Sequence, residues 1–147
     1  MTERTTPRVV IIGAGFGGLR ATHALAGAPV TVHLLDRNNY HTFLPLLYQV
    51  AAAELEPSLI ARSVRSLVQR QTNARFVMAE VEGIDFDAQV VHSADQDLPY
   101  DYLILALGSV DHFFATPGAT TYCFTLKSLE EGVTLRNHTL RCVERAA

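Results

Sequence analysis

The chain has 147 residues, of which 48% are hydrophobic and 18% charged, so we expect one folded domain with its own core. The net charge at pH 7 is −3, and no block of basic residues is present, which excludes nucleic acid as a partner. There is no apolar run of about 18 residues and no hydrophobic signal segment, so we predict no transmembrane helix and a cytoplasmic location.

The first elements predict a strand, a helix and a second strand. Val9–Ile12 is a run of β-branched residues that is typical of a strand buried on both faces, and Gly13 ends it. Small and apolar residues then recur at helical spacing over residues 17–26. Val30–Leu35 is a second apolar strand that stops at Asp36. Such a unit places its two strands parallel to each other.

The middle of the chain predicts a covering segment, a helix and a meander. Residues 39–56 are too apolar for an ordinary solvent loop, so we expect them to cover another part of the protein. From Pro57 the spacing of apolar residues predicts a surface helix of about four turns. Residues 75–87 and 89–93 are predicted strands joined by a tight turn, and a further strand follows them in a small antiparallel meander.

Two elements close the chain. Tyr102–Leu107 is another apolar run ended by a glycine, Gly108, and we expect this strand to return to the parallel sheet. Ser128 and Glu131 have the spacing of a capping box and begin a C-terminal helix. The predicted fold class is therefore α/β, a Rossmann-like domain with a parallel sheet, crossover helices and a small antiparallel β-meander.

Residues 13–18 form a glycine-rich turn with the pattern G-x-G-x-x-G. Gly13 permits the tight turn, Gly15 lets a pyrophosphate approach the backbone, and Gly18 lets the helix pack closely on the strand. Asp36 ends the second strand 18 residues after Gly18, where an acid accepts hydrogen bonds from ribose hydroxyls. Together these features predict a dinucleotide-binding site.

The type of dinucleotide is less sharply defined by the motif. An acid at Asp36 suits an unphosphorylated ribose and disfavours NADP, but FAD and NAD share the same fingerprint. Residues 75–107 form a meander and a return strand where an NAD-dependent dehydrogenase would have a second helix-linked half. This difference favours a flavin.

The sequence gives little support for a metal site or a redox-active pair of cysteines. The six histidines have no metal-ligand spacing, so we expect no metal. Cys123 and Cys142 form neither a CxxC nor a CxxxxC pair, which argues against a redox dithiol. We expect both to be reduced, buried thiols.

Several segments together resemble the type II NADH dehydrogenases, the single-subunit NADH:quinone oxidoreductases. The resemblance covers nearly the whole chain. The segments that carry it are 8–18, 35–51 and 100–109, followed by Phe113-Phe114, Pro117-Gly118 and 126–130.

The resemblance implies that this chain holds FAD. The glycine turn would bind the pyrophosphate, the residues after the second strand would surround the adenosine, and an apolar segment would lie beside the flavin. Leu107 departs from the threonine of the family's usual Ala-Thr-Gly strand end. No catalytic residue is assigned. The implied cofactor-binding residues are Gly13, Ala14, Gly15, Phe16, Gly17, Gly18, Asp36, Arg37, Asn38, Pro45, Leu46, Val81, Ala106 and Gly108.

The same resemblance implies an oxidoreductase of the respiratory chain that passes electrons from NADH through FAD to a quinone. Residues 1–127 would be the FAD-binding domain, and 128–147 a helix leading toward an NADH-binding domain. Because the sequence has no second G-x-G-x-x-G, we expect a fragment that is inactive alone. The complete enzyme would attach peripherally to the cytoplasmic face of the membrane through a C-terminal region, and it would form a homodimer.

Two alternatives stay open. One is the FAD domain of a related reductase of the sulfide:quinone or ferredoxin type. The other is a non-catalytic dinucleotide-binding module that senses or stores a cofactor.

Overall fold

The computed structural model describes residues 6–147, which divide into two compact units. The first unit contains the residues up to His41 together with Ser63–Gly108, and the second contains Thr42–Arg62 together with Ser109–Ala147. Each unit is therefore built from two separate stretches of the chain.

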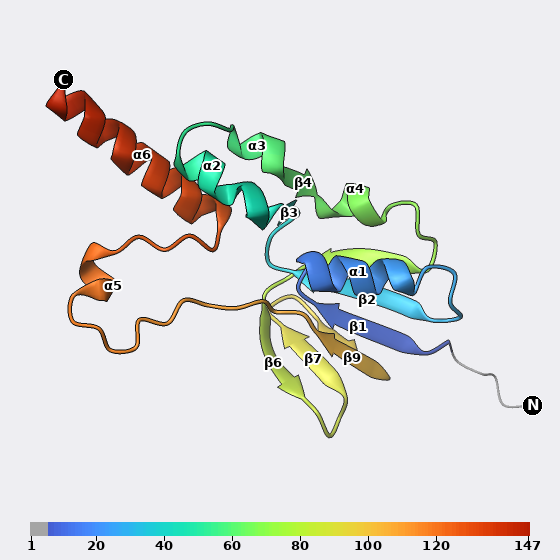
Figure 1. The fold of residues 1–147 in the computed structure, drawn as a ribbon. Coiled ribbons are helices and arrows are strands. Elements are labelled where there is room, and N and C mark those ends of the chain that lie inside the picture. Colours follow the sequence, from blue (N-terminus) through green and yellow to red (C-terminus); the bar gives the residue numbers. More distant parts are fainter. Residues whose placement is uncertain (1–5) are drawn as a thin grey trace, which may run out of the picture. The chain divides into compact units, whose positions relative to one another are not determined.

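The first unit holds the two larger sheets (Figure 1). A two-stranded sheet of β3 (Tyr40–Thr42) and β4 (Ala61–Ser63) marks where the chain leaves this unit and returns to it. The other elements are β1 (Arg8–Ile12), α1 (Phe16–Ala24), β2 (Thr31–Asp36), α4 (Val64–Val68), β5 (Ala74–Met78), β6 (Val81–Asp85), β7 (Val90–Ser93), β8 (Asp97–Pro99) and β9 (Tyr102–Leu105).

The main sheet has four parallel strands in the order β5-β2-β1-β9. Val10 lies at its centre, opposite His33 of β2 on one side and Leu103 of β9 on the other. The chain moves outward from β1 to β2 and β5, then returns to the other side of β1 as β9. The carboxyl ends of all four strands consequently meet at one edge, and the order reverses between β1 and β9. This confirms the predicted Rossmann-like fold.

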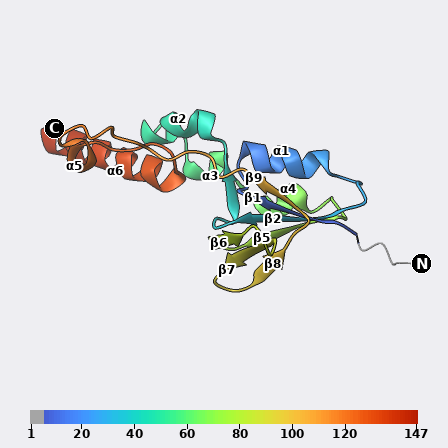
Figure 2. The ribbon, with the colours of Figure 1, turned by 90° about the horizontal axis from the view of Figure 1, so that it is seen from below.

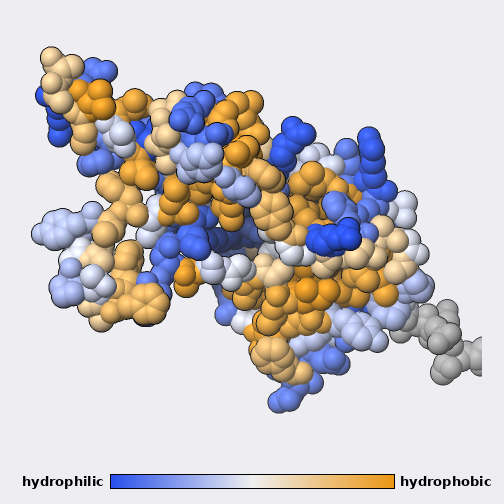
Figure 3. Space-filling view, in the orientation of Figure 1, coloured by the Kyte–Doolittle hydropathy of each residue, from blue (hydrophilic) through white to orange (hydrophobic). Residues whose placement is uncertain are grey.

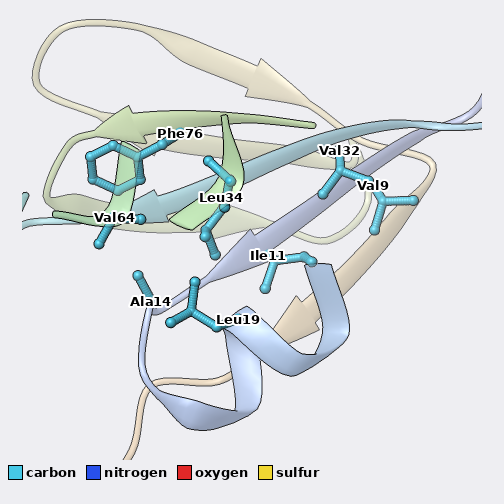
Figure 4. Packing of buried hydrophobic residues seen from close by; sticks show 9 residues of the cluster. Val9, Ile11, Ala14, Leu19, Val32, Leu34, Val64 and Phe76 are labelled. Carbon is cyan, nitrogen blue, oxygen red and sulfur yellow. The ribbon is translucent and has the colours of Figure 1, made fainter. Parts of the chain in front are cut away.

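Each face of the main sheet is covered by a different layer. Helices α1 and α4 cover one face, where Ile11, Leu34 and Leu19 pack with Val64 (Figure 4). The antiparallel sheet β6-β7-β8 covers the other face, as the view from below shows (Figure 2). The apolar residues of β1 are therefore buried on both sides of the sheet, which explains why Val9–Ile12 is continuously apolar rather than alternating.

The predicted strand over 75–87 is wrong as a single element. Its first part is β5, which pairs in parallel with β2 in the main sheet, and its second part is β6 of the meander. The two strands separate just beyond Ala79, whose N–H donates to the Asp36 carbonyl at 3.0 Å. An apolar pattern marks each strand but does not say which sheet it joins. The meander itself is confirmed as β6-β7-β8.

The predicted four-turn helix after Pro57 is also wrong. The structure has α3 (Pro57–Ile60) and α4, separated by the extended residues of β4. Ile60 and Val64 are both fully buried, but Ile60 belongs to the core of the second unit and Val64 to that of the first. Their helical spacing therefore does not mark one continuous helix face.

The second unit is a small helical assembly. Leu47, Val50 and Ile60 form its core with Leu129 and Val133 of the last helix, so the predicted covering segment does pack against apolar residues. Its elements are η1 (Leu44–Leu46), α2 (Leu47–Ala51), α3, α5 (Ala119–Tyr122) and α6 (Leu129–Ala146).

The start of α6 confirms the predicted capping box. The Ser128 hydroxyl accepts from the Glu131 N–H at 3.2 Å, and Glu131 accepts from the Ser128 N–H at 3.0 Å. Glu131 also accepts from the Thr125 hydroxyl at 2.7 Å and the Lys127 N–H at 2.6 Å. These bonds, that from Thr125 first, lower the pKa of the Glu131 carboxyl. The last helix therefore has a firmly ordered first turn.

Many side chains of the second unit are exposed. Cys123 and Cys142 are both exposed, so the expectation of buried thiols is wrong. Large apolar side chains are exposed as well, including Val110, Phe114 and Tyr122. Apolar residues, in orange, lie on the surface of the face shown in Figure 3. No helix within residues 6–147 is long and apolar enough to cross a membrane.

The stability of the first unit should fall in mildly acidic solution because of His33. Its Nδ1 is buried without a hydrogen-bond partner. Burial, then Arg75 and Arg8, lower its pKa below the ordinary 6.5. The unfolded chain therefore takes up a proton first, and stability is full above about pH 6.5 and declines below it.

Urea unfolding between about pH 7.5 and 5.5 measures this loss, in a range where ordinary carboxyls stay charged. His33→Leu should flatten the dependence of the unfolding midpoint on pH. An unchanged slope in His33→Leu would contradict the assignment.

Candidate nucleotide-binding site

The candidate site lies at the carboxyl edge of the main sheet, where β1 turns into α1. The Gly13 N–H donates to the Leu35 carbonyl at 2.7 Å, and the Ala106 N–H donates to the Ile12 carbonyl at 2.8 Å. The ends of three parallel strands are thus tied together around the turn. Ligands of open α/β sheets bind at this kind of edge, where the strand order reverses.

Helix α1 points its amino terminus at this edge. The helix has nine residues, its N-cap is Gly15, and no side chain caps it. Leu19 is the residue whose N–H reaches back to the Gly15 carbonyl, at 3.0 Å. The N–H groups of a helix's first turn have no carbonyl partner within the helix, and the helix dipole is positive there. This end of α1 therefore favours an anion such as a phosphate.

Two of the motif glycines are required by the protein's own backbone. Gly13 has a φ of +102°, and a Cβ there would overlap the Ala106 carbonyl oxygen. A Cβ on Gly18 would overlap the Gly13 carbonyl oxygen and come within 3.5 Å of Ile11 Cγ2. These positions allow the sharp turn and the close packing of α1 on β1.

Gly15 differs from the other two. Its φ of −72° is open to any residue, and a Cβ at this position would meet nothing within 4 Å. The fold itself therefore does not require glycine at this position. The position is exposed at the amino terminus of α1, where a ligand can reach it. A bare backbone beside open space is what a closely approaching phosphate group needs.

Asp36 lies beside the glycine turn. One carboxylate oxygen accepts from the Ala14 N–H at 2.7 Å, and the other accepts from the Asn38 N–H at 2.8 Å. An ionised carboxylate has about four acceptor positions, so two remain for a ligand. The structure thus brings Asp36 to the loop, and its contact with a ribose stays a prediction.

The other predicted residues are distributed over both units. Asn38 adjoins Asp36, and the exposed Arg37 lies 3.9 Å from Glu80 between Nη1 and Oε1. Val81 lies at the start of β6, and Pro45 and Leu46 lie in η1 of the second unit. After β9, Ala106 lies against Gly13, Leu107 is exposed, and Gly108 has a φ of +76°. Their contacts with a cofactor stay predictions. Within residues 6–147 no three metal-ligating side chains are grouped to hold an ion.

His41 contacts the turn in a way that the sequence does not predict. Its Nδ1 lies 3.0 Å from the Ala14 carbonyl oxygen, and its ring meets the Phe16 ring edge to face, with centroids 4.9 Å apart. The resemblance implied that the apolar segment after β2 lies beside a flavin. It gave no sign that His41 reaches the glycine turn.

The pyridine nucleotide-disulphide oxidoreductase family matches residues 7–147. The chain belongs to this family. It is 41% identical over 143 residues to the type II NADH:quinone oxidoreductase NdhA of Mycobacterium tuberculosis, covering 95% of this chain and 30% of that protein. It is 32% identical over 151 residues to the demethylphylloquinone reductase NdbB of Synechocystis, covering 95% of this chain and 37% of that protein.

The chain therefore spans about a third of the length of these relatives, and its resemblance to type II NADH dehydrogenases is confirmed. Solved structures agree on the fold. NDH2 from Plasmodium falciparum in complex with NADH aligns with a TM-score of 0.87 at 23% identity, over 97% of this chain and 30% of that one. The sulfide:quinone oxidoreductase of Aquifex aeolicus aligns with a TM-score of 0.82 at 23% identity, over 94% and 32%.

Substitution of two motif glycines should separate folding from binding. Gly18→Ala should lower the free energy of unfolding by roughly 3 kcal/mol, because the new methyl overlaps the Gly13 carbonyl. Gly15→Ser should leave stability unchanged or raise it by a few tenths of a kcal/mol, because serine is a good N-cap. Urea unfolding of both variants checks this difference. Equal losses at the two positions would mean that Gly15 is also needed by the fold.

Proposed function

We propose that this chain binds FAD and forms the FAD-holding part of an oxidoreductase that passes electrons from NADH to a quinone. The observation that carries the proposal is the exposed, uncapped amino terminus of α1 at Gly15, with Asp36 beside it. The two relatives named as NADH:quinone oxidoreductase and demethylphylloquinone reductase support the choice of acceptor.

The residues of the first unit fit the AMP half of FAD. The first turn of α1 would hold the pyrophosphate, with the bare backbone of Gly15 allowing close approach. The two remaining acceptor positions of Asp36 would take the ribose hydroxyls. Arg37 and Asn38 would lie around the ribose, and Val81 would meet the adenine through its backbone. Ala106 and Gly108 would border the cofactor at the end of β9. When bound, FAD supplies the redox chemistry, since a flavin accepts a hydride and passes its electrons on.

The order of elements after β5 supports FAD over NAD. The chain enters the meander β6-β7-β8 and then returns as β9 beside β1. A second helix-linked mononucleotide half, which dinucleotide dehydrogenases use, does not follow within the described residues. In the proposed enzyme Pro45 and Leu46 lie beside the flavin. Residues 1–127 act as the FAD domain, and 128–147 lead toward an NADH-binding domain.

The resemblance also supports a proposal on place and assembly. The enzyme would work on the cytoplasmic face of a membrane to which it is attached peripherally, as a homodimer. Cell fractionation and sedimentation would test both statements, and recovery of a purely soluble monomer would overturn them.

FAD binding should depend on the space at Gly15. Gly15→Val places two methyl groups where the pyrophosphate would lie, and we expect FAD to bind more than about tenfold more weakly. Flavin fluorescence and absorption, after removal of free FAD, measure the bound fraction. Gly83→Val is the matched control, because a Cβ on this β6 glycine also meets nothing within 4 Å.

FMN, which lacks the AMP half, should bind more weakly than FAD to the unmodified protein. Folded protein that binds neither FAD nor NADH would contradict the nucleotide site. Tighter binding of NADH than of FAD would move the assignment from flavin to nicotinamide. Equal FAD binding by Gly15→Val and Gly83→Val would remove the role of the loop.

A chimaera tests the electron-transfer part of the proposal. This chain would replace the matched segment of Mycobacterium tuberculosis NdhA, to which it is 41% identical. We expect the chimaera to contain FAD and to reduce a soluble quinone with NADH, and expect Gly15→Val to abolish both properties. The reductant is varied as a control, with sulfide in place of NADH. A folded, FAD-loaded chimaera that is inactive with NADH would contradict the proposed reaction.

A further inference from the structure

Both backbone polar groups of Ala14 are held by side chains from elsewhere in the first unit. Its N–H donates to Asp36 Oδ2 at 2.7 Å, and its carbonyl oxygen lies 3.0 Å from His41 Nδ1. Ala14 itself is only 2% exposed, so water does not replace these partners. Asp36, at the end of β2, and His41, in the middle of β3, thus fix the second residue of the glycine motif.

The contact with His41 also orients the next residue. The peptide bond between Ala14 and Gly15 is trans, since the described chain contains no cis peptide. In a trans peptide the carbonyl and the following N–H lie in one plane and point in opposite directions. A partner that holds the Ala14 carbonyl on one side therefore turns the Gly15 N–H to the other. Asp36 holds the preceding peptide and cannot do this by itself.

We propose that His41 is a positioning residue for the phosphate loop. By donating from Nδ1 to the Ala14 carbonyl, it fixes the Ala14–Gly15 peptide plane so that the Gly15 N–H is presented to the pyrophosphate of a dinucleotide. This inference rests on the proposed function. The histidine acts through the backbone, because its own contacts are with the loop and with Phe16.

The Phe16 ring limits how the imidazole can move. The two rings meet at 90°, an arrangement in which the edge of one aromatic ring lies on the face of another. Phe16 is the first residue of α1, so the contact ties the start of the helix to β3. The imidazole is therefore held by packing as well as by its hydrogen bond. A flexible donor would hold the peptide plane less firmly.

The geometry requires a particular proton position on His41. A carbonyl oxygen only accepts hydrogen bonds, so Nδ1 must carry the proton and, in the neutral ring, Nε2 must not. Nitrogen-15 NMR of the ring measures the tautomer directly in the unliganded protein. We expect the Nδ1-protonated form, and a neutral ring protonated at Nε2 would overturn the proposal whether or not FAD binds.

Three variants test the consequence for binding. His41→Phe keeps a ring beside Phe16 but removes the donor, whereas His41→Asn restores a donor at the same distance along the side chain. His23→Phe is the matched control, because His23 Nε2 lies 3.2 Å from the Leu67 carbonyl at the far end of α1. Loss of one such hydrogen bond should weaken FAD binding about tenfold in His41→Phe. His41→Asn should bind within about twofold of the unmodified protein, and His23→Phe should be unaffected.

The Gly15 amide resonance gives a second readout that needs no FAD. His41→Phe should shift this resonance, and His41→Asn should return it toward its original position. If the unmodified protein binds no FAD, the proposed function fails while the tautomer and amide data still test His41. If FAD binds equally to the unmodified protein and a folded His41→Phe, the positioning role is wrong. An unmoved Gly15 resonance in that variant would overturn it as well.

Discussion

The close approach of Gly18 to the Gly13 carbonyl is the contact on which the site depends. It allows α1 to start directly beneath the end of β1, with no room for a side chain between helix and turn. The amino terminus of α1 is consequently placed at the carboxyl edge of the sheet, next to the end of β2. Asp36 then reaches the turn and accepts a hydrogen bond from the Ala14 N–H, which links the end of β2 to the glycine turn. Backbone packing, rather than any charged side chain, determines where a phosphate could bind.

Features that depend on a short stretch of sequence could be predicted. The continuous apolar run Val9–Ile12 of β1 is buried on both faces, as the sequence predicted. The glycine spacing located the turn, and the acid at Asp36 located the end of β2. The capping box of Ser128 and Glu131 is a local signal that depends on four consecutive residues, and the structure has both of its hydrogen bonds.

Features that depend on distant packing were not predictable in the same way. Ile60 and Val64 have the spacing of one helix face, yet they are buried in different cores, so the chain is extended between them. The strands β5 and β6 follow each other closely in sequence but join different sheets. His41 reaches Ala14 because β3 lies near the glycine turn, 27 positions along the chain. Neither residue type nor spacing contains that information.

The division of the second unit into two stretches of sequence bears on the order in which the chain folds. Leu47, Val50 and Ile60 emerge from the ribosome well before Leu129 and Val133, which complete their core. The strands of the first unit, up to β9, are all synthesised before Leu129. The parallel sheet can therefore assemble while the apolar segment between β3 and β4 still lacks its helical partner. During synthesis this apolar segment is therefore open to aggregation or to capture by a chaperone.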